Sequence, residues 1–347
     1  MKENLVLNKD SKRLMYLDIA KGIGIILVVI GHTSSSLTKY IYQFHMPLFF
    51  FISGFLFSKK KPVKNYVVKK IESLYIPYVL CNLVVYIPLA IIENQSIQRI
   101  LIKTLKIIFL LDGAVLLGAT WFIASLFWIS ILFRISFYIC DRFNVKKYNI
   151  LYMIIMIFGV IGLYTHLPFK ISTMMTGFAF FCLGYILKSN INKNISVKLK
   201  VILSIISLLV IISFAQINNI EMSQSIYTYK ILFIISSMCG IFLILTMSSV
   251  IEKMGDKALS YIGKNSIYIL ILHFIAFKIV ILFQIYIYND SLTKLNTFPI
   301  LYYNNGWWIV YSVIGVFVPL ILGGMWQRVL KYLKMSTLRN RYCYKKV

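Results

Sequence analysis

The chain has 347 residues, 59% of them hydrophobic, and a mean hydropathy of +0.80. Soluble domains are only about 45–50% apolar, so this composition excludes an ordinary soluble protein. The formal net charge of +26 does not indicate nucleic-acid binding. The basic residues lie in short segments between long apolar runs, as in the cytoplasmic loops of membrane proteins.

Apolar runs of about 20 residues recur to the C-terminus, which is the length that crosses a bilayer as an α-helix. They do not alternate with polar residues as the strands of a membrane β-barrel would. We therefore predict an all-α polytopic integral membrane protein, with one membrane domain over residues 1–347. The ten predicted spans are 15–36, 41–58, 71–92, 120–140, 148–165, 171–188, 199–217, 228–250, 265–288 and 307–330.

A weaker apolar run, 104–118, lies in the connection 93–119 and contains Asp112 and two glycines. It predicts an interfacial or re-entrant helix, because an eleventh span would invert every later loop. With ten spans, the inner segments hold 27 Lys and Arg residues and the outer segments hold 6. This asymmetry predicts that both termini are cytoplasmic. We expect a multi-pass protein of a bacterial plasma membrane.

The first span carries three ionisable residues, Asp18, Lys21 and His32. Such residues inside a membrane span are costly and usually functional. On a helix, Lys21 and His32 lie within roughly 20° of each other and about 16 Å apart in depth. The predicted orientation places Asp18 and Lys21 toward the cytoplasm and His32 toward the outside. The span therefore carries one polar stripe through much of the membrane.

Asp18 and Lys21 are three residues apart and can pair on the helix surface. Two interpretations are open: a snorkelling pair at the inner headgroups, or an element that binds an anion near the cytoplasmic face. Gly22 and Gly24 beside them allow close approach of a backbone or a ligand.

His32 precedes a Thr-Ser-Ser-Ser segment at the end of the first span, and His45 begins the second span. A short hairpin between antiparallel spans would place the two histidines at similar depth. Histidine is the commonest general base, so we predict catalytic roles for both. The alternative for His32 is an interfacial histidine bonded to a neighbouring hydroxyl. The spacing of the four histidines does not predict a metal site.

Later parts of the chain supply further candidates. Trp121 opens the fourth span and is either a residue of the interfacial aromatic belt or a pocket wall. His273 falls near the middle of the ninth span, where it would line a polar interior. Lys278 either serves the same cavity or snorkels outward. The outer loop 289–306 is rich in Asn, Tyr and Trp and is either an aromatic belt or a sugar-contacting rim.

The segments Asp18-x-x-Lys21-x10-His32 and FHMPLFFFISGFLF resemble the membrane-bound acyltransferase-three superfamily. The branch most similar to this chain is that of the fucose-4-O-acetylase-like polysaccharide O-acetyltransferases. The resemblance covers essentially the whole chain. It extends to the Thr-Trp-Phe segment at Trp121 and to the NSIYILILH span that contains His273.

This resemblance implies transfer of an acyl group, usually acetyl, from cytoplasmic acyl-coenzyme A to a hydroxyl of a sugar. The acceptor would be an extracytoplasmic surface polysaccharide, such as a capsule or exopolysaccharide, or its lipid-linked precursor. The basic residue of the family signature falls on Lys21, and its histidine falls on His32. Acetyl-CoA is then a co-substrate, with no permanently bound cofactor. Many relatives carry arginine in place of this lysine, and the two side chains bind anions differently.

The chemistry of the residues agrees with this implication. Transfer to a sugar hydroxyl needs a base for the hydroxyl proton, and His32 lies at the depth where an outer sugar would arrive. An oxyanion donor is also needed; the candidates are His45, Ser53 and Trp121, and a covalent acyl-enzyme is an open alternative. The competing function is a secondary transporter or exporter, since ionisable residues inside spans also serve proton relays.

Overall fold

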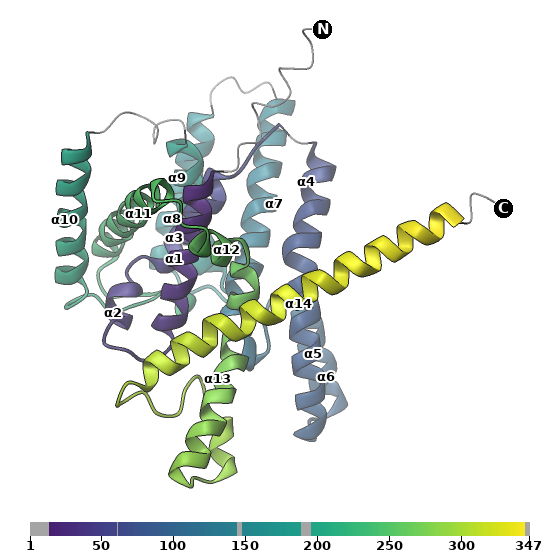
Figure 1. The fold of residues 1–347 in the computed structure, drawn as a ribbon. Coiled ribbons are helices and arrows are strands. Elements are labelled where there is room, and N and C mark those ends of the chain that lie inside the picture. Colours follow the sequence, from purple (N-terminus) through teal and green to yellow (C-terminus); the bar gives the residue numbers. More distant parts are fainter. Residues whose placement is uncertain (1–13, 61, 144–147, 189–195, 344–347) are drawn as a thin grey trace.

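The computed structural model describes residues 14–343 except 61, 144–147 and 189–195. The chain folds into a bundle of helices joined by short turns, and the long helix α14 runs obliquely across it (Figure 1). The helices of the first half are α1 (Met15–Gly31), α2 (Thr38–Ile41), α3 (His45–Phe55), α4 (Val63–Lys70), the π-helical η1 (Ile71–Tyr75), α5 (Ile76–Ile92), α6 (Ile97–Ile108), the 3-10 helix η2 (Val115–Thr120) and α7 (Trp121–Arg142). The second half contains α8 (Asn149–Tyr164), α9 (Ile171–Leu187), α10 (Val197–Phe214), η3 (Met222–Gln224), α11 (Lys230–Lys253), α12 (Ala258–Lys264), α13 (Ser266–Tyr288), η4 (Leu292–Asn296) and α14 (Trp307–Cys343).

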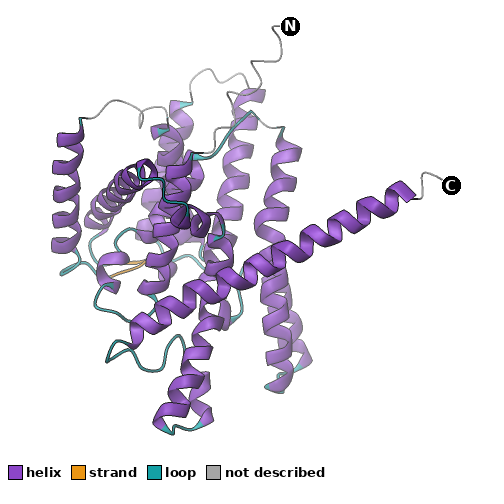
Figure 2. Ribbon diagram, in the orientation of Figure 1, coloured by secondary structure: helices purple, strands orange, loops and turns teal. Residues whose placement is uncertain are grey.

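Helices dominate, as the sequence predicted, with one small addition. Strand β1 (Ile220–Glu221) pairs antiparallel with β2 (Ile226–Tyr227) in the loop before α11 (Figure 2). Six helical segments are long and apolar enough to cross a membrane. They are Val63–Ile92, Val115–Arg142, Val197–Phe214, Lys230–Lys253, Ser266–Tyr288 and Trp307–Arg328, and α8 and α9 are shorter apolar helices.

Two predicted spans are shorter than expected. The predicted span 41–58 contains α3, whose 11 residues are about 16 Å long. The predicted span 15–36 stops at Gly31, because the chain turns at Ser34, whose φ is +50°. There the hydroxyls of Thr33 and Thr38 donate to the carbonyls of Ile30 and Gly31 and satisfy the end of the helix. The count of ten spans stays a prediction.

The connection 93–119 forms a helical hairpin, not an eleventh span. Helix α6 has 12 residues, begins at an N-cap in which Ser96 accepts from the backbone N–H of Arg99, and lies beside α5. Residues 109–114 are not helical before η2 begins at Val115.

The termini and several basic segments (1–13, 61, 144–147, 189–195 and 344–347) lie outside the described residues. The cytoplasmic placement of the termini therefore stays a prediction.

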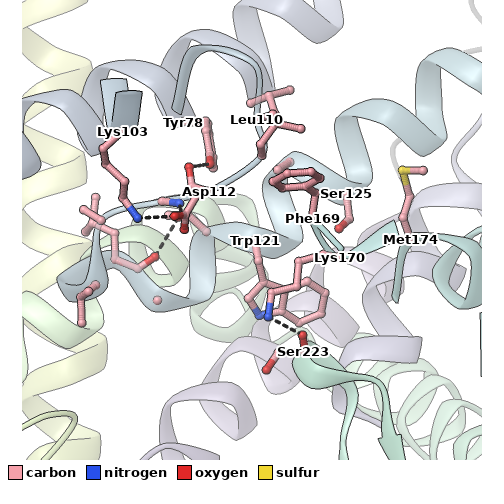
Figure 3. A pocket seen from close by; sticks show the side chains of 18 of the residues that line it. Tyr78, Lys103, Leu110, Asp112, Trp121, Ser125, Phe169, Lys170, Met174 and Ser223 are labelled. Atoms are coloured by element: carbon pink, nitrogen blue, oxygen red, sulfur yellow. Dashed lines mark hydrogen bonds and ion pairs between the residues drawn. The ribbon is translucent and has the colours of Figure 1, made fainter. Parts of the chain in front are cut away.

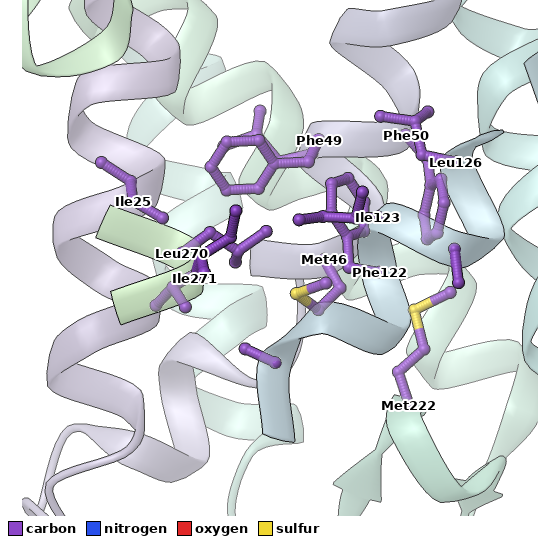
Figure 4. Close-up of a cluster of buried hydrophobic side chains, with 14 of the residues drawn as sticks. Ile25, Met46, Phe49, Phe50, Phe122, Ile123, Leu126, Met222, Leu270 and Ile271 are labelled. Carbon is purple, nitrogen blue, oxygen red and sulfur yellow. The ribbon is translucent and has the colours of Figure 1, made fainter. Parts of the chain in front are cut away.

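A core of interleaved apolar side chains from α1, α3, α7 and α13 joins the early and late halves of the chain (Figure 4). Phe50 of α3 is fully buried, and its ring lies 4.8 Å from that of Phe122 in α7. Helices α3 and α9 approach so closely that a Cβ at Gly54 would lie 1.8 Å from the carbonyl oxygen of Phe181. Glycine is required at such a crossing because any side chain would separate the two helices.

Candidate functional site

Helix α1 holds the polar stripe that the sequence predicted. It is continuous from Met15 to Gly31, so Lys21 and His32 are separated by about 16 Å along its axis. Its first turn has no side-chain cap of its own. Instead, Glu252 at the end of α11 accepts from the backbone N–H of Tyr16 at 3.0 Å. A carboxylate suits the positive end of the helix dipole and fixes where α1 begins.

At the inner part of α1, Asp18 and Lys21 form the expected ion pair, with 2.7 Å between the Lys21 Nζ and an Asp18 carboxylate oxygen. Asp18 is buried, and Lys21 is one-fifth exposed. Gly22 serves close approach of a backbone here: a Cβ at Gly22 would lie 2.2 Å from the carbonyl oxygen of Leu259 in α12. Helix α12 therefore packs directly on the helical turn that carries the pair.

At the other end of α1, His32 lies among rings from two other segments. Its Nδ1 is 3.2 Å from the hydroxyl of Tyr42, which precedes α3. Its ring stacks on His273 of α13, with 5.4 Å between centroids and 17° between planes. Phe274 lies against the same ring at 4.8 Å. The sequence did not reveal that His32 and His273 touch, because 241 residues of chain separate them.

His45 lies near this cluster. Tyr42 lies between His45 and His32, the two histidines that the sequence predicted at similar depth. The centroid of the Tyr42 ring is 4.9 Å from that of His45 and 6.1 Å from that of His32. Ser53 is eight residues further along α3, about 12 Å from His45 along the axis, and is only partly buried. The side chain of Tyr42 thus contacts His45 through its ring and His32 through its hydroxyl, and Ser53 lies at a different depth.

The backbone fixes the tautomers of two histidines. The Nδ1 of His45 is 2.9 Å from the carbonyl oxygen of Ile41, and the Nδ1 of His273 is 3.0 Å from the carbonyl oxygens of both Ile269 and Leu270. A carbonyl oxygen only accepts, so each Nδ1 carries a proton, and in the neutral ring Nε2 holds the lone pair. Neither neutral ring can then donate a second hydrogen bond through Nε2.

The Nε2 of His273 is the atom whose environment points most directly to a ligand. His273 is fully buried, and its Nε2 has no hydrogen-bond partner among the described residues. Buried polar atoms are nearly always paired in folded proteins, and an exception calls for an explanation such as a substrate. The Nε2 of His273 is an acceptor, and its ring is in van der Waals contact with His32. It is therefore well placed to receive a hydrogen bond from a hydroxyl.

A hollow of about 320 Å³ lies beside this cluster (Figure 3). We call it the outer hollow because the predicted topology places it toward the outside. Trp121 lines it, so this tryptophan is a pocket wall. The polar lining comes from loops far apart in sequence. Lys103 pairs with Asp112, Tyr78 donates to the Asp112 backbone carbonyl at 2.6 Å, and Lys170 donates to the Ser223 carbonyl at 2.7 Å.

Phe274 lies between the outer hollow and the histidines. Its ring is 4.8 Å from His32 on one side and 4.7 Å from Phe298, which lines the hollow, on the other. A Cβ at Gly118, also in the hollow, would lie 3.4 Å from Phe274. The ring of Phe274 therefore lies between the hollow and the candidate base.

The loop 289–306, interpreted from sequence as a belt or a rim, contributes Phe298 to this wall. Lys278 of α13 neither snorkels freely nor pairs with an acid among the described residues. Its Nζ donates to the carbonyls of Leu295 and Thr297 at 2.8 and 2.7 Å and ties the loop to the helix. No sequence signal distinguished Phe274 or Phe298, since aromatic residues are common throughout the chain.

No group of three or more His, Cys, Asp or Glu side chains in the described part of the chain is arranged to hold a metal ion. The four described cysteines are unpaired thiols.

Comparison with known proteins identifies the family. Residues 14–324 match the sequence model of the acyltransferase-3 family, which describes an acyltransferase domain. No curated protein and no solved structure matches the chain. The match spans every residue of the histidine cluster, the Asp18–Lys21 pair and the outer hollow. The chain therefore belongs to the acyltransferase-3 family, whose members are membrane-bound acyltransferases.

Proposed function

We propose that this protein transfers an acetyl group from cytoplasmic acetyl-CoA to a sugar hydroxyl of a surface polysaccharide or its lipid-linked precursor, with His32 as the general base. The proposal includes membership of the fucose-4-O-acetylase-like branch and location in a bacterial plasma membrane. The observation that carries the proposal is the contact of His32 with Tyr42 and the stacking of His32 on His273, whose buried Nε2 has no hydrogen-bond partner among the described residues.

Tyr42 explains how His32 would act as a base. When the Nδ1–H of His32 donates to the Tyr42 hydroxyl, the lone pair is on Nε2 and can take a proton. The sugar oxygen then attacks the thioester carbonyl carbon, and its proton passes to His32. When the carbon–sulfur bond breaks, the imidazolium returns that proton to the leaving thiolate. The ester and free coenzyme A are the products, and His32 is regenerated.

The developing oxyanion needs a donor. Neutral His45 does not supply one through Nε2, because its proton is on Nδ1 and is bonded to Ile41. Ser53 lies about 12 Å along α3 from the histidine cluster. We therefore favour the indole N–H of Trp121, which lines the hollow next to Phe274 and whose nitrogen only donates.

The donor end of the proposal depends on Lys21. A thioester donor is anionic at its nucleotide end, and Lys21 lies at the opposite end of α1 from His32. The pantetheine arm would extend along α1 and carry the acetyl group toward His32. Asp18, buried against Lys21, would hold the ammonium in position.

The test is O-acetylation of surface glycans in a strain that lacks the gene, measured by NMR after complementation. Wild-type protein should restore the O-acetyl signals, and His32→Ala should reduce the rate of transfer by roughly 10²- to 10⁴-fold. The control is Tyr138→Ala, which removes a half-exposed ring from α7 and should restore acetylation fully. Equal membrane levels of the variants are checked by immunoblot.

Unchanged glycan acetylation in the deletion strain would contradict the proposal. If solute flux changed instead, the chain would be an exporter that uses its intramembrane ionisable residues as a proton relay.

A further inference from the structure

A lateral groove, distinct from the outer hollow, opens between α5 and α6 on one side and α13 with η4 on the other. Its volume is about 710 Å³. The wall is largely aliphatic, with Leu89, Val115, Leu116, Leu282 and Leu295 along it. Val115 is 70% exposed and Leu282 is 45% exposed, so both present apolar surface to whatever fills the groove. In a membrane protein such a surface suits an acyl or prenyl chain.

Cationic side chains border the groove. Arg99 and Lys103 of α6 line it, as does Lys278 from the opposite wall. Glu93 is the acidic side chain in this lining, and it accepts from Gln95 at 2.7 Å. None of the ion pairs between described residues includes Arg99. The groove therefore combines an apolar wall with a net positive edge.

The positive edge is unusual for this chain. Of the six basic residues in the outer segments of the predicted topology, four border this region: Arg99 and Lys103 line the groove, and Lys106 and Lys170 line the adjoining outer hollows. Arg99, Lys103 and Lys106 lie on α6, and Lys170 precedes α9. The few outer cations are thus concentrated at one place, which favours an anionic ligand there.

The groove and the outer hollow adjoin each other. Lys103, Ala114, Val115 and Phe298 line both. Consider a ligand whose apolar chain lies in the groove and whose anionic group lies at Arg99 and Lys103. The part of its head group beyond the anionic group would then lie in the hollow. That hollow is bounded by Trp121 and leads through Phe274 to His32.

We propose that the lateral groove binds the phosphate-bearing polyprenyl carrier of the acceptor sugar, with the phosphate at Arg99 and Lys103 and the prenyl chain along α5 and α13. This inference rests on the proposed function, because it identifies how the acceptor reaches the site. It makes the acceptor a lipid-linked precursor rather than a finished polymer.

The test uses the full-length protein in nanodiscs of zwitterionic lipid and measures binding of a fluorescent polyprenyl phosphate. Arg99→Gln should weaken binding roughly tenfold, as expected for loss of one hydrogen bond to a charged group. The matched control is Lys39→Gln, an outer cation that donates to Gln216 away from the groove and should leave affinity unchanged. Equal affinities for Arg99→Gln and wild type would overturn the proposal.

A second pair of variants tests the apolar wall. Val115→Trp fills the groove and should also weaken binding, whereas Ile205→Trp, on the exposed face of α10, should not. Competition by phosphatidylglycerol as strong as that by unlabelled polyprenyl phosphate would show an ordinary lipid site and overturn the assignment. Equally strong competition by a soluble acidic oligosaccharide would do the same.

The acetylation assay separates this inference from the proposed function. If wild-type protein acetylates glycans while Arg99→Gln and Val115→Trp bind polyprenyl phosphate normally, the groove assignment fails and the function stands. If polyprenyl phosphate binds as proposed but no acetyl group is transferred, the proposed function fails.

Discussion

At the Met15 end of α1, Asp18 and Lys21 form an ion pair beside the closely packed backbone of α12, whereas at the Gly31 end His32 lies among rings from other segments. The first region is held by backbone packing and charge pairing. The second contains a buried acceptor, the Nε2 of His273, without a partner among the described residues. Satisfied polar groups stabilise a fold, while an unpaired one marks a place for a ligand.

The contrast suggests different consequences of substitution at the two ends. Changes near Asp18 should act on stability as well as on function. Changes near His32 should act mainly on the reaction. Three predictions examine this difference, in order of expected effect.

The largest effect is expected for Lys21→Ala. It breaks the ion pair between Lys21 and Asp18, which is only 3% exposed, and breaking a buried pair should cost about 3 kcal/mol of stability. Thermal unfolding of the purified protein in detergent measures this. The double variant Asp18→Asn/Lys21→Met replaces both charges and should recover most of the lost stability.

The double variant also isolates the role of Lys21 in donor binding. It should bind acetyl-CoA more weakly than wild type although it is folded, while its affinity for the acceptor is unchanged. Acetyl-CoA affinity equal to that of wild type, measured by calorimetry, would remove Lys21 from the coenzyme site.

The next effect is expected at the contact between α1 and α12. A Cβ at Gly263 would lie 1.8 Å from the carbonyl oxygen of Asp18, so Gly263→Ala should destabilise the protein by about 2 kcal/mol. Gly324→Ala in α14 is the matched control, because its Cβ would meet its nearest neighbour at 3.6 Å. That control should be neutral or slightly stabilising. Equal melting temperatures for the two variants would refute the close packing.

The smallest effect in energy, but the most informative one, concerns His273. His273→Asn keeps a polar atom near the position of Nδ1 and removes Nε2, whereas His273→Gln keeps one near Nε2. We expect His273→Asn to lower transfer about tenfold, the loss of one hydrogen bond to a charged or reacting group. His273→Gln should retain more activity.

The order of these two activities is the critical result, measured as initial rates at equal protein levels. If His273→Gln were the slower variant, the Nδ1 contact with the helix carbonyls would matter more than the free Nε2. His273 would then only position the neighbouring ring.

Local sequence patterns were sufficient to predict where the helices lie in the chain. Apolar runs and their polar interruptions predicted helices at all ten places where spans were expected, since each run is long enough to need internal hydrogen bonding in an apolar medium. They failed at boundaries, as in α1, because the turn at Ser34 depends on side-chain hydroxyls that satisfy the last carbonyls. The predicted span 41–58 was also too long, because α3 begins at His45 and ends at Phe55.

For the candidate site, the sequence alone determined which residues are costly to bury, namely Asp18, Lys21, His32, His45 and His273. Helical periodicity also gave the spacing within α1. Only the tertiary structure decided that His273 stacks on His32, that Tyr42 connects His32 with His45, and that Phe274 closes the outer hollow. These contacts join residues on different helices, and helices in a membrane associate through close van der Waals packing and interhelical hydrogen bonds, whose geometry a sequence pattern does not specify.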